Sequence, residues 1–211
     1  MDVILDFDFK LNKDQVIQTL KSYGSILKDE EMEYLYQKLL PILYENIEPT
    51  GIFEIEKKED TFNFEAVKNY KYIVYCIITM GDACTGKVTE FFSYGNMKEG
   101  MILDAMASSY LFELSSQLFS HIYDKAKGLN LGLSCRISPG DGEIPLKCQK
   151  YILDKLDAEN FLNLTVNEDY MLSSMRSMAY IYGADKNIKL NKKDHDCSRC
   201  PNRNLCSMRK S

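Results

Sequence analysis

Apolar and polar positions recur with two different periods along the chain, and each change of period marks a predicted element. Asn12 and Gln15 form a capping box ahead of apolar residues spaced three and four apart, and Gly24 stands where a helix would end. A short amphipathic helix is therefore predicted here. A second helical pattern ends near Leu43 and contains Pro41, which predicts a kink or a break at that point.

The next part of the chain has the period of two that strands require. Residues 51–57 alternate between apolar and polar side chains, and the alternation resumes at Phe62 and Phe64, which favours strands that form a hairpin. Residues 72–80 are an unbroken run of β-branched and aromatic residues, the composition of a buried central strand.

The period becomes helical again from about Lys87. One helix is predicted over residues 86–92, and a longer one from the Gly95-Asn96 break to about Lys127, with an apolar stripe that marks it as the central buried helix. A short strand over 131–137, a helix beginning at Pro145 and a β-hairpin from 175–182 and 187–190 follow. The layout predicts an α+β fold, in which a mostly antiparallel twisted sheet with hairpins packs against a long central helix and flanking helices.

Charge divides the 211 residues into two predicted units. The overall net charge is −5, but residues 192–211 carry six basic and two acidic side chains, so the tail is +4 and the first 191 residues sum to −9. An acidic body repels nucleic-acid phosphates, which argues against a nucleic-acid partner. No apolar run approaches the length of a membrane span. We expect an α+β domain over 1–191 and a separate basic, cysteine-rich tail over 192–211.

The seven cysteines are an odd number for a disulfide framework. The first ten residues carry acids where a signal peptide needs basic residues, so a reducing cytoplasm is expected. The chain also has only two histidines and no Gly-x-Ser-x-Gly elbow, which gives a hydrolytic triad little support. No catalytic residue is assigned from the sequence.

Three of the cysteines, Cys197, Cys200 and Cys206, lie in the tail. Thiolates at the spacing of Cys197 and Cys200 bind one metal readily, because the intervening turn directs both sulfurs to the same point. His195, an exogenous ligand, Cys135 or Cys148 would complete the site, and the spacing fits either an iron–sulfur cluster or a zinc ion. The alternative, three unliganded thiols in a basic tail, is disfavoured because exposed free thiols are reactive.

Residues 81–87 match the phosphate-binding pattern G-x-x-x-x-G-K between a predicted strand and a predicted helix. Val88 stands where the pattern needs a Ser or Thr hydroxyl for Mg²⁺, and the surrounding chain lacks repeated βαβ units. A glycine-punctuated turn is the favoured interpretation, with a nucleotide-binding P-loop as the third-ranked function.

A second candidate site runs from Arg136 to Gly142. An arginine that ends a strand, followed by a turn with free backbone N–H groups and two glycines, suits a small molecule that bears a carboxylate. On spacing alone, a tight turn beside an ordinary surface arginine is the favoured alternative. The candidate ligand-binding residues are Arg136, Ser138, Pro139, Gly140, Asp141 and Gly142.

Several motifs follow one another in a characteristic order: Gly95 to Ser108, Arg136-Ile-Ser-Pro-Gly, Gly142-Glu-Ile-Pro-Leu, Leu164-Thr165, Met171, and Arg176-Ser-Met-Ala through Gly183. This order resembles the reactivation domain of cobalamin-dependent methionine synthase, most closely its free-standing short versions. The likeness covers about residues 70–190 and displaces the P-loop interpretation.

This resemblance implies a site and a role. Arg136 would hold the carboxylate of S-adenosylmethionine, and Ser138, Pro139 and Gly140 would supply the turn. The methyl group would then pass to a cobalamin on another protein. The chain would thus assist a corrinoid-dependent methyltransferase in trans, as one part of a split methionine synthase. An electron donor, or an iron–sulfur cluster in the tail, would supply the low-potential electron.

The sequence departs from the family at one position of the turn. The family usually continues Pro-Gly-Tyr, whereas this chain has Asp141. A carboxylate there either attracts the ligand's sulfonium or ammonium group or pairs with Arg136 and competes with the ligand. The rival function is therefore a non-catalytic interaction module with a degenerate ligand site and a metal-stapled tail.

Overall fold

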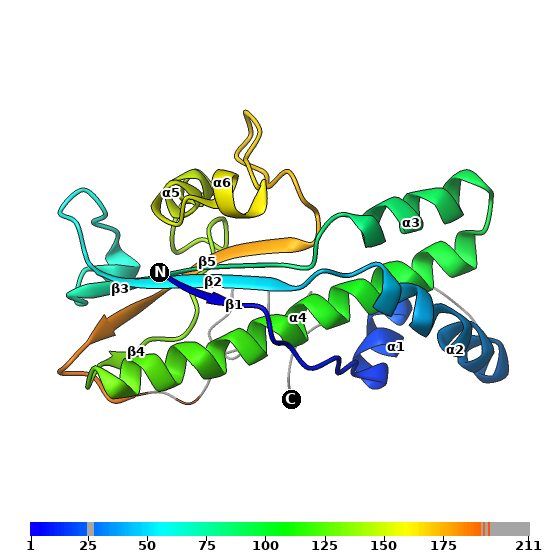
Figure 1. Ribbon diagram of the computed structural model, residues 1–211, viewed down its shortest axis with the longest axis horizontal. Helices are drawn as coiled ribbons and strands as arrows, with labels where there is room; N and C mark the ends of the chain where they lie inside the picture. The colour runs from blue at the N-terminus through cyan, green and yellow to red at the C-terminus, as the bar shows by residue number, and fades with distance from the viewer. Residues whose placement is uncertain (25–27, 191, 193, 195–211) are drawn as a thin grey trace.

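An antiparallel sheet forms the middle layer of the molecule (Figure 1). The structure is a computed structural model that describes residues 1–24, 28–190, 192 and 194. Within this part of the chain the sheet has five strands in the order β1-β2-β3-β5-β4. Their bounds are β1 Asp2–Ile4, β2 Thr50–Lys57, β3 Tyr72–Thr79, β4 Gly132–Leu133 and β5 Ser177–Asp185.

Strand β3 is the central strand that the sequence predicted. It pairs along its whole length with β2 and with β5, so Tyr72 lies opposite both Lys57 and Ala184. Alternate side chains enter two different cores: Val74, Cys76 and Ile78 on one face, and Ile73, Tyr75 and Ile77 on the other. Both faces need cover, which explains why the run has no polar alternation.

Helix α4, Met97–Gly128, covers one face of the sheet and confirms the predicted central helix (Figure 1). Its buried stripe includes Leu103, Met106, Leu114 and Leu118. Helices α1 (Lys13–Ser22), α2 (Asp29–Glu45) and α3 (Ala83–Ser93) also pack against α4. This helical layer and the sheet enclose the larger core.

Two helix-end predictions have different outcomes. The Asn12 side chain accepts a hydrogen bond from the Gln15 N–H at 3.1 Å, which confirms the cap of α1. Helix α2, however, continues through Pro41 to Glu45, so a break at the proline is wrong. Leu39 and Leu43 are fully buried on either side of Pro41, and their packing holds the helix across the missing hydrogen bond.

The opposite face of the sheet is covered by α5 (Cys148–Lys155), α6 (Ala158–Leu162) and the 3₁₀ turn η1 (Glu65–Val67). Their apolar residues form the second core together with Ile73, Tyr75 and Ile77. Figure 1 shows α5 and α6 on one side of the sheet and α4 on the other. The result is an α+β fold of helices, antiparallel sheet and helices, as predicted.

Three predicted strand segments need correction. Phe62 and Phe64 belong to no strand; Phe62 stacks on Tyr151, so their alternation reflects aromatic packing over the sheet. The segment 131–137 pairs only at β4 and through an isolated bridge at Ile137. Residues 187–190 form no hairpin with β5, because the Asp185 carboxylate accepts the Asn187 N–H and turns the chain away.

No helix in the described part of the chain is both long enough and apolar enough to cross a membrane.

Gly183 in β5 provides a test of the second core. A Cβ atom at this position would overlap the ring of Tyr70, which packs against that core. We expect Gly183→Ala to lower the free energy of unfolding by about 1–3 kcal/mol, the usual effect of overpacking. Urea unfolding followed by circular dichroism measures this change.

Gly86 is the matched control, because it lies in α3 and a Cβ there would meet nothing within 4 Å. Gly86→Ala should raise the unfolding free energy by up to about 1 kcal/mol through helix propensity. Equal stability of the two variants would contradict the assigned packing of Tyr70 on Gly183.

Candidate ligand site at Arg136

The predicted turn after Arg136 is present. Ile137 bridges to Ile181 of β5, and the Gly140 N–H donates to the Ile144 carbonyl at 2.9 Å. Gly140 and Gly142 both have φ near +90°, a backbone conformation that favours glycine. Both glycines are exposed, but the Asp141 N–H also donates within the turn, to the Ser138 carbonyl at 3.3 Å, so the prediction of free N–H groups is wrong for Gly140 and Asp141.

Arg136 itself is not an ordinary surface residue, which corrects the alternative that spacing favoured. Its side chain is only 8% exposed and lies between α4 and β5. The Nη1 atom donates to the Ser115 Oγ atom at 3.0 Å, and the guanidinium lies 5.2 Å from the ring centroid of Tyr180. The Phe112 ring flanks it at 5.9 Å. Apolar and aromatic walls therefore surround a positive charge.

The carboxylate that pairs with this charge belongs to Asp194. Its Oδ2 atom is 3.6 Å from Arg136 Nη1, and its main-chain carbonyl accepts the Arg136 N–H at 2.8 Å. Its Oδ1 atom accepts a hydrogen bond from the Tyr182 hydroxyl. Burial is the largest influence on Arg136 and acts to lower its pKa, but the charges of Asp194, Tyr180, Tyr182 and Asp141 together outweigh burial and raise that pKa. The guanidinium therefore stays charged.

Tyr180 adds an unsatisfied donor to the same place. Its hydroxyl is buried and has no hydrogen-bond partner among the described residues. Burial raises the pKa of Tyr180 well above its usual value, so the hydroxyl can donate a hydrogen bond but is no base at neutral pH. We call Arg136, Asp194, Ser115, Tyr180 and Tyr182 the Arg136 cluster. Chemically it is a buried cation that already holds one carboxylate, that of Asp194, with weak solvent screening.

A second buried arginine, Arg176, directly precedes β5 and contacts α4, and sequence reasoning did not predict its ion pair. Arg176 pairs with Asp104 and donates from Nη1 to the Ser108 Oγ atom at 3.0 Å. Tyr23 donates to the same carboxylate at 3.2 Å. Asp104 and Ser108 stand one helical turn apart among buried residues of α4, a sequence signal that pointed to a buried polar partner.

The structure does not support a P-loop at residues 81–87. Helix α3 already begins at Ala83, so Gly86 and Lys87 lie inside the helix instead of in a loop around a phosphate. The Lys87 Nζ atom pairs with Glu90 at 2.8 Å on the exposed helix surface. The short stretch between strand and helix contains only a glycine-permitted turn at Gly81, φ +76°.

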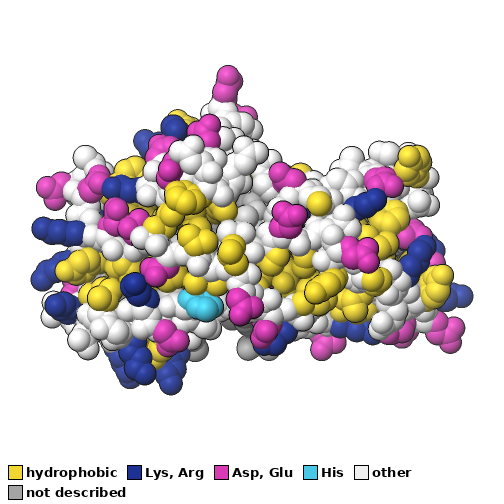
Figure 2. All heavy atoms as spheres, in the orientation of Figure 1, with side chains coloured by type: hydrophobic (Ala, Val, Ile, Leu, Met, Phe, Trp, Pro, Cys, Tyr) yellow, Lys and Arg dark blue, Asp and Glu magenta, His cyan; other side chains and the backbone are white. Residues whose placement is uncertain are grey.

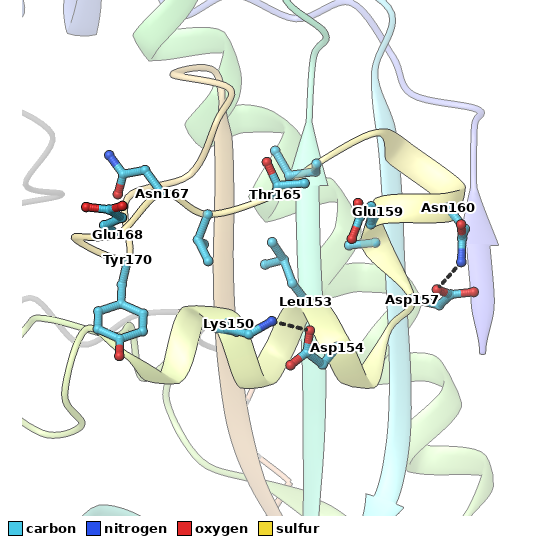
Figure 3. Close-up of a pocket in the computed structure, with 13 residues that line it drawn as sticks. Lys150, Leu153, Asp154, Asp157, Glu159, Asn160, Thr165, Asn167, Glu168 and Tyr170 are labelled. Atoms are coloured by element: carbon cyan, nitrogen blue, oxygen red, sulfur yellow. Dashed lines mark hydrogen bonds and ion pairs between the residues drawn. The ribbon is translucent and has the colours of Figure 1, made fainter.

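A hollow of about 620 Å³ lies between α5, α6 and residues 164–170 (Figure 3). The charged residues of its lining are four acids and one lysine, Lys150, which pairs with Asp154 at 3.1 Å. Figure 2 shows acidic side chains around this upper part of the molecule. A carboxylate ligand would be repelled here, so the hollow does not replace Arg136 as the candidate site.

The predicted metal ligands Cys197, Cys200, Cys206 and His195 lie outside the described residues. Within the described ranges, no group of three His, Cys, Asp or Glu side chains is placed to hold a metal ion. Within the described part of the chain, Cys76, Cys84 and Cys148 are free cysteines. Cys148, one candidate for a fourth ligand, is buried in the core under α5.

Comparison with known proteins gives a match to a solved structure and none by sequence. Neither the family models nor the curated proteins contain a match to this chain. Among solved structures, the chain is similar to the crystal structure of the MetH reactivation domain bound to AdoHcy, with a TM-score of 0.57 and 11% identity. The match covers 82% of this chain and 74% of the other. At this identity the likeness is one of fold, so the α+β architecture of this chain is that of a MetH reactivation domain.

Proposed function

We propose that this protein binds S-adenosylmethionine at the Arg136 turn and supports the reductive reactivation of a corrinoid on a partner methyltransferase. The observation that carries the proposal is a buried, charged arginine directly before an open Pro-Gly turn, in a fold whose solved relative binds AdoHcy. The protein is then an accessory part of a split methionine synthase in a reducing compartment.

The chemistry assigns a task to each part of the turn. The guanidinium takes the amino-acid carboxylate, and the absence of a Cβ atom at Gly140 and Gly142 allows close approach to the backbone. Asp141 is half-buried beside the turn and supplies a negative charge for the sulfonium or ammonium group. Transfer of a methyl group to cobalt moves no proton, so the proposal assigns no acid or base among the described residues.

The electron and atom balance defines what the partners provide. One electron from a donor reduces cob(II)alamin to cob(I)alamin, whose cobalt attacks the methyl carbon of the ligand. The carbon–sulfur bond breaks, and methylcob(III)alamin and S-adenosylhomocysteine form. The corrinoid belongs to the partner, and the electron comes from an external donor or from a metal centre in the tail.

The tail is included in the proposal as a metal site. Cys197, Cys200 and Cys206 supply three thiolates, and His195 or an exogenous ligand completes the set. An iron–sulfur cluster would fit a role in electron transfer, and zinc would fit a docking role.

One observation favours the second candidate function, an interaction module without a ligand. Arg136 already has a carboxylate partner within the chain, Asp194. In this alternative the buried ion pair is purely structural, and the tail docks a protein partner.

The ligand proposal is tested by isothermal titration calorimetry with S-adenosylmethionine and S-adenosylhomocysteine. We expect both to bind the parent protein and Arg136→Gln to weaken both about 10- to 100-fold, since hydrogen bonds to charged groups contribute about 1.5–3 kcal/mol. Lys87→Ala, on the exposed face of α3, should bind like the parent. A folded parent protein that gives no heat with either ligand contradicts the proposal and supports the interaction module.

Asp141→Asn separates the two roles left open for this carboxylate. If Asp141 attracts the sulfonium, the variant should bind S-adenosylmethionine about 5-fold more weakly, since a partly exposed pair contributes about 1 kcal/mol. Affinity for the uncharged thioether of S-adenosylhomocysteine should change less. Equal losses for both ligands would assign Asp141 to the ammonium group, and tighter binding of both would show competition at Arg136.

The tail proposal is tested by metal analysis after anaerobic purification. We expect iron with the visible absorbance of a cluster, or one zinc, and loss of that metal in a variant with Ser at Cys197, Cys200 and Cys206. A Cys84→Ser variant is the control, because burial raises the pKa of this core thiol to about 11 and keeps it un-ionised. A metal-free parent protein, or metal retained in the triple variant, would contradict the tail site.

A further inference from the structure

Asp194 joins two parts of the chain that have different chemistry. Its carboxylate and its main-chain carbonyl both contact Arg136. The three cysteines of the tail begin only three residues later. A carboxylate from the base of the tail thus stands where an amino-acid ligand would place its own carboxylate.

We propose that Asp194 is an internal competitor at the Arg136 cluster, which must leave the guanidinium before the carboxylate of an external ligand can bind. This inference rests on the proposed ligand function and names its regulation. Asp194 is docked on Arg136 when the ligand is absent and is released when the ligand is bound.

The distances favour such an exchange. The 3.6 Å separation between Arg136 Nη1 and Asp194 Oδ2 exceeds the 2.7–2.9 Å typical of a charge-assisted hydrogen bond. A ligand carboxylate able to approach the guanidinium more closely forms the stronger pair. The exchange replaces one carboxylate by another, so the buried cation has a counter-charge both before and after the exchange.

The tyrosines of the Arg136 cluster supply further donors for the incoming group. The Tyr182 hydroxyl, which now donates to Asp194, becomes available when Asp194 leaves. The Tyr180 hydroxyl is buried and lacks a partner among the described residues. An incoming carboxylate can therefore accept more hydrogen bonds in the Arg136 cluster than Asp194 accepts, which offsets the cost of releasing Asp194.

The other buried arginine shows why this exchange is specific to Arg136. Arg176 pairs with Asp104, which lies within the long helix α4. Asp104 cannot leave its arginine without disturbing the helix, whereas Asp194 follows the last described strand and helix of the chain.

Competition at Arg136 also links the ligand to the tail cysteines. A metal or partner that binds the tail and changes the free energy of Asp194 docking changes ligand affinity by the same factor that the ligand changes tail affinity. Binding of a metal or partner to the tail would therefore change the affinity of the Arg136 cluster for the ligand.

The first experiment measures S-adenosylhomocysteine affinity by calorimetry for the parent protein, Asp194→Asn and the matched control Asp104→Asn. We expect Asp194→Asn to bind about 10-fold more tightly than the parent, a typical coupling between two sites. Asp104→Asn should show no tightening, because it breaks the other buried arginine pair.

The outcomes separate the competitor from the proposed function. If the parent binds and Asp194→Asn binds no more tightly, the competitor is overturned and the ligand function stands. If Asp104→Asn tightens equally, general loosening explains the effect and the competitor is overturned. If folded parent and variant both fail to bind, both proposals fall.

A second experiment uses the unaltered protein, in case Asp194→Asn does not fold. Lys192 is exposed and lies two residues before Asp194. We expect saturating S-adenosylhomocysteine to accelerate tryptic cleavage after Lys192 at least severalfold, as followed by mass spectrometry, because release of Asp194 frees this segment. Cleavage after exposed Lys10 should not change. Slower or equal cleavage after Lys192 at saturation would overturn the competitor.

Discussion

The burial of β3 on both faces is the constraint on which the rest of this structure depends. Its alternate side chains enter two separate cores, so helices must cover the sheet on both sides. Helix α4 provides one cover, and α5 with α6 provides the other (Figure 1). Because β5 pairs with β3 along eight residues, Tyr180 and Tyr182 are directed toward α4, where they form one wall around Arg136.

The same arrangement makes the burial of the Arg136 guanidinium costly in free energy. A guanidinium between α4 and β5 needs a counter-charge, and the neighbouring α4 residues contribute only the neutral Ser115 and the Phe112 ring. Asp194, which follows β5 in the sequence, provides this counter-charge. Arg136 thus pairs with a residue at the end of the described chain, whereas Arg176 pairs with a residue of α4.

Much of this fold could be predicted because its signals are local. The buried strand at 72–80, the long helix ending near Lys127 and the capping box at Asn12 each follow from a continuous pattern. The failures involve contacts remote in sequence. Phe62 alternates with its neighbours because it packs on Tyr151, and residues 187–190 lose their strand to an Asp185 turn.

The candidate site shows the same limit. The turn itself follows from Pro139, Gly140 and Gly142, but the burial of Arg136 depends on α4 residues about twenty positions earlier and on Asp194, 58 positions later. Asp141, only five residues away, was one carboxylate that the sequence offered as a partner of Arg136, with the sulfonium or ammonium group of a ligand as its other expected partner. The structure places the Asp194 carboxylate at that guanidinium, and the charge of Asp141 acts on it as well, since both carboxylates help to raise the pKa of Arg136. One carboxylate five positions away and another 58 positions away thus act on the same buried cation, and only the nearer of the two could be expected from the sequence.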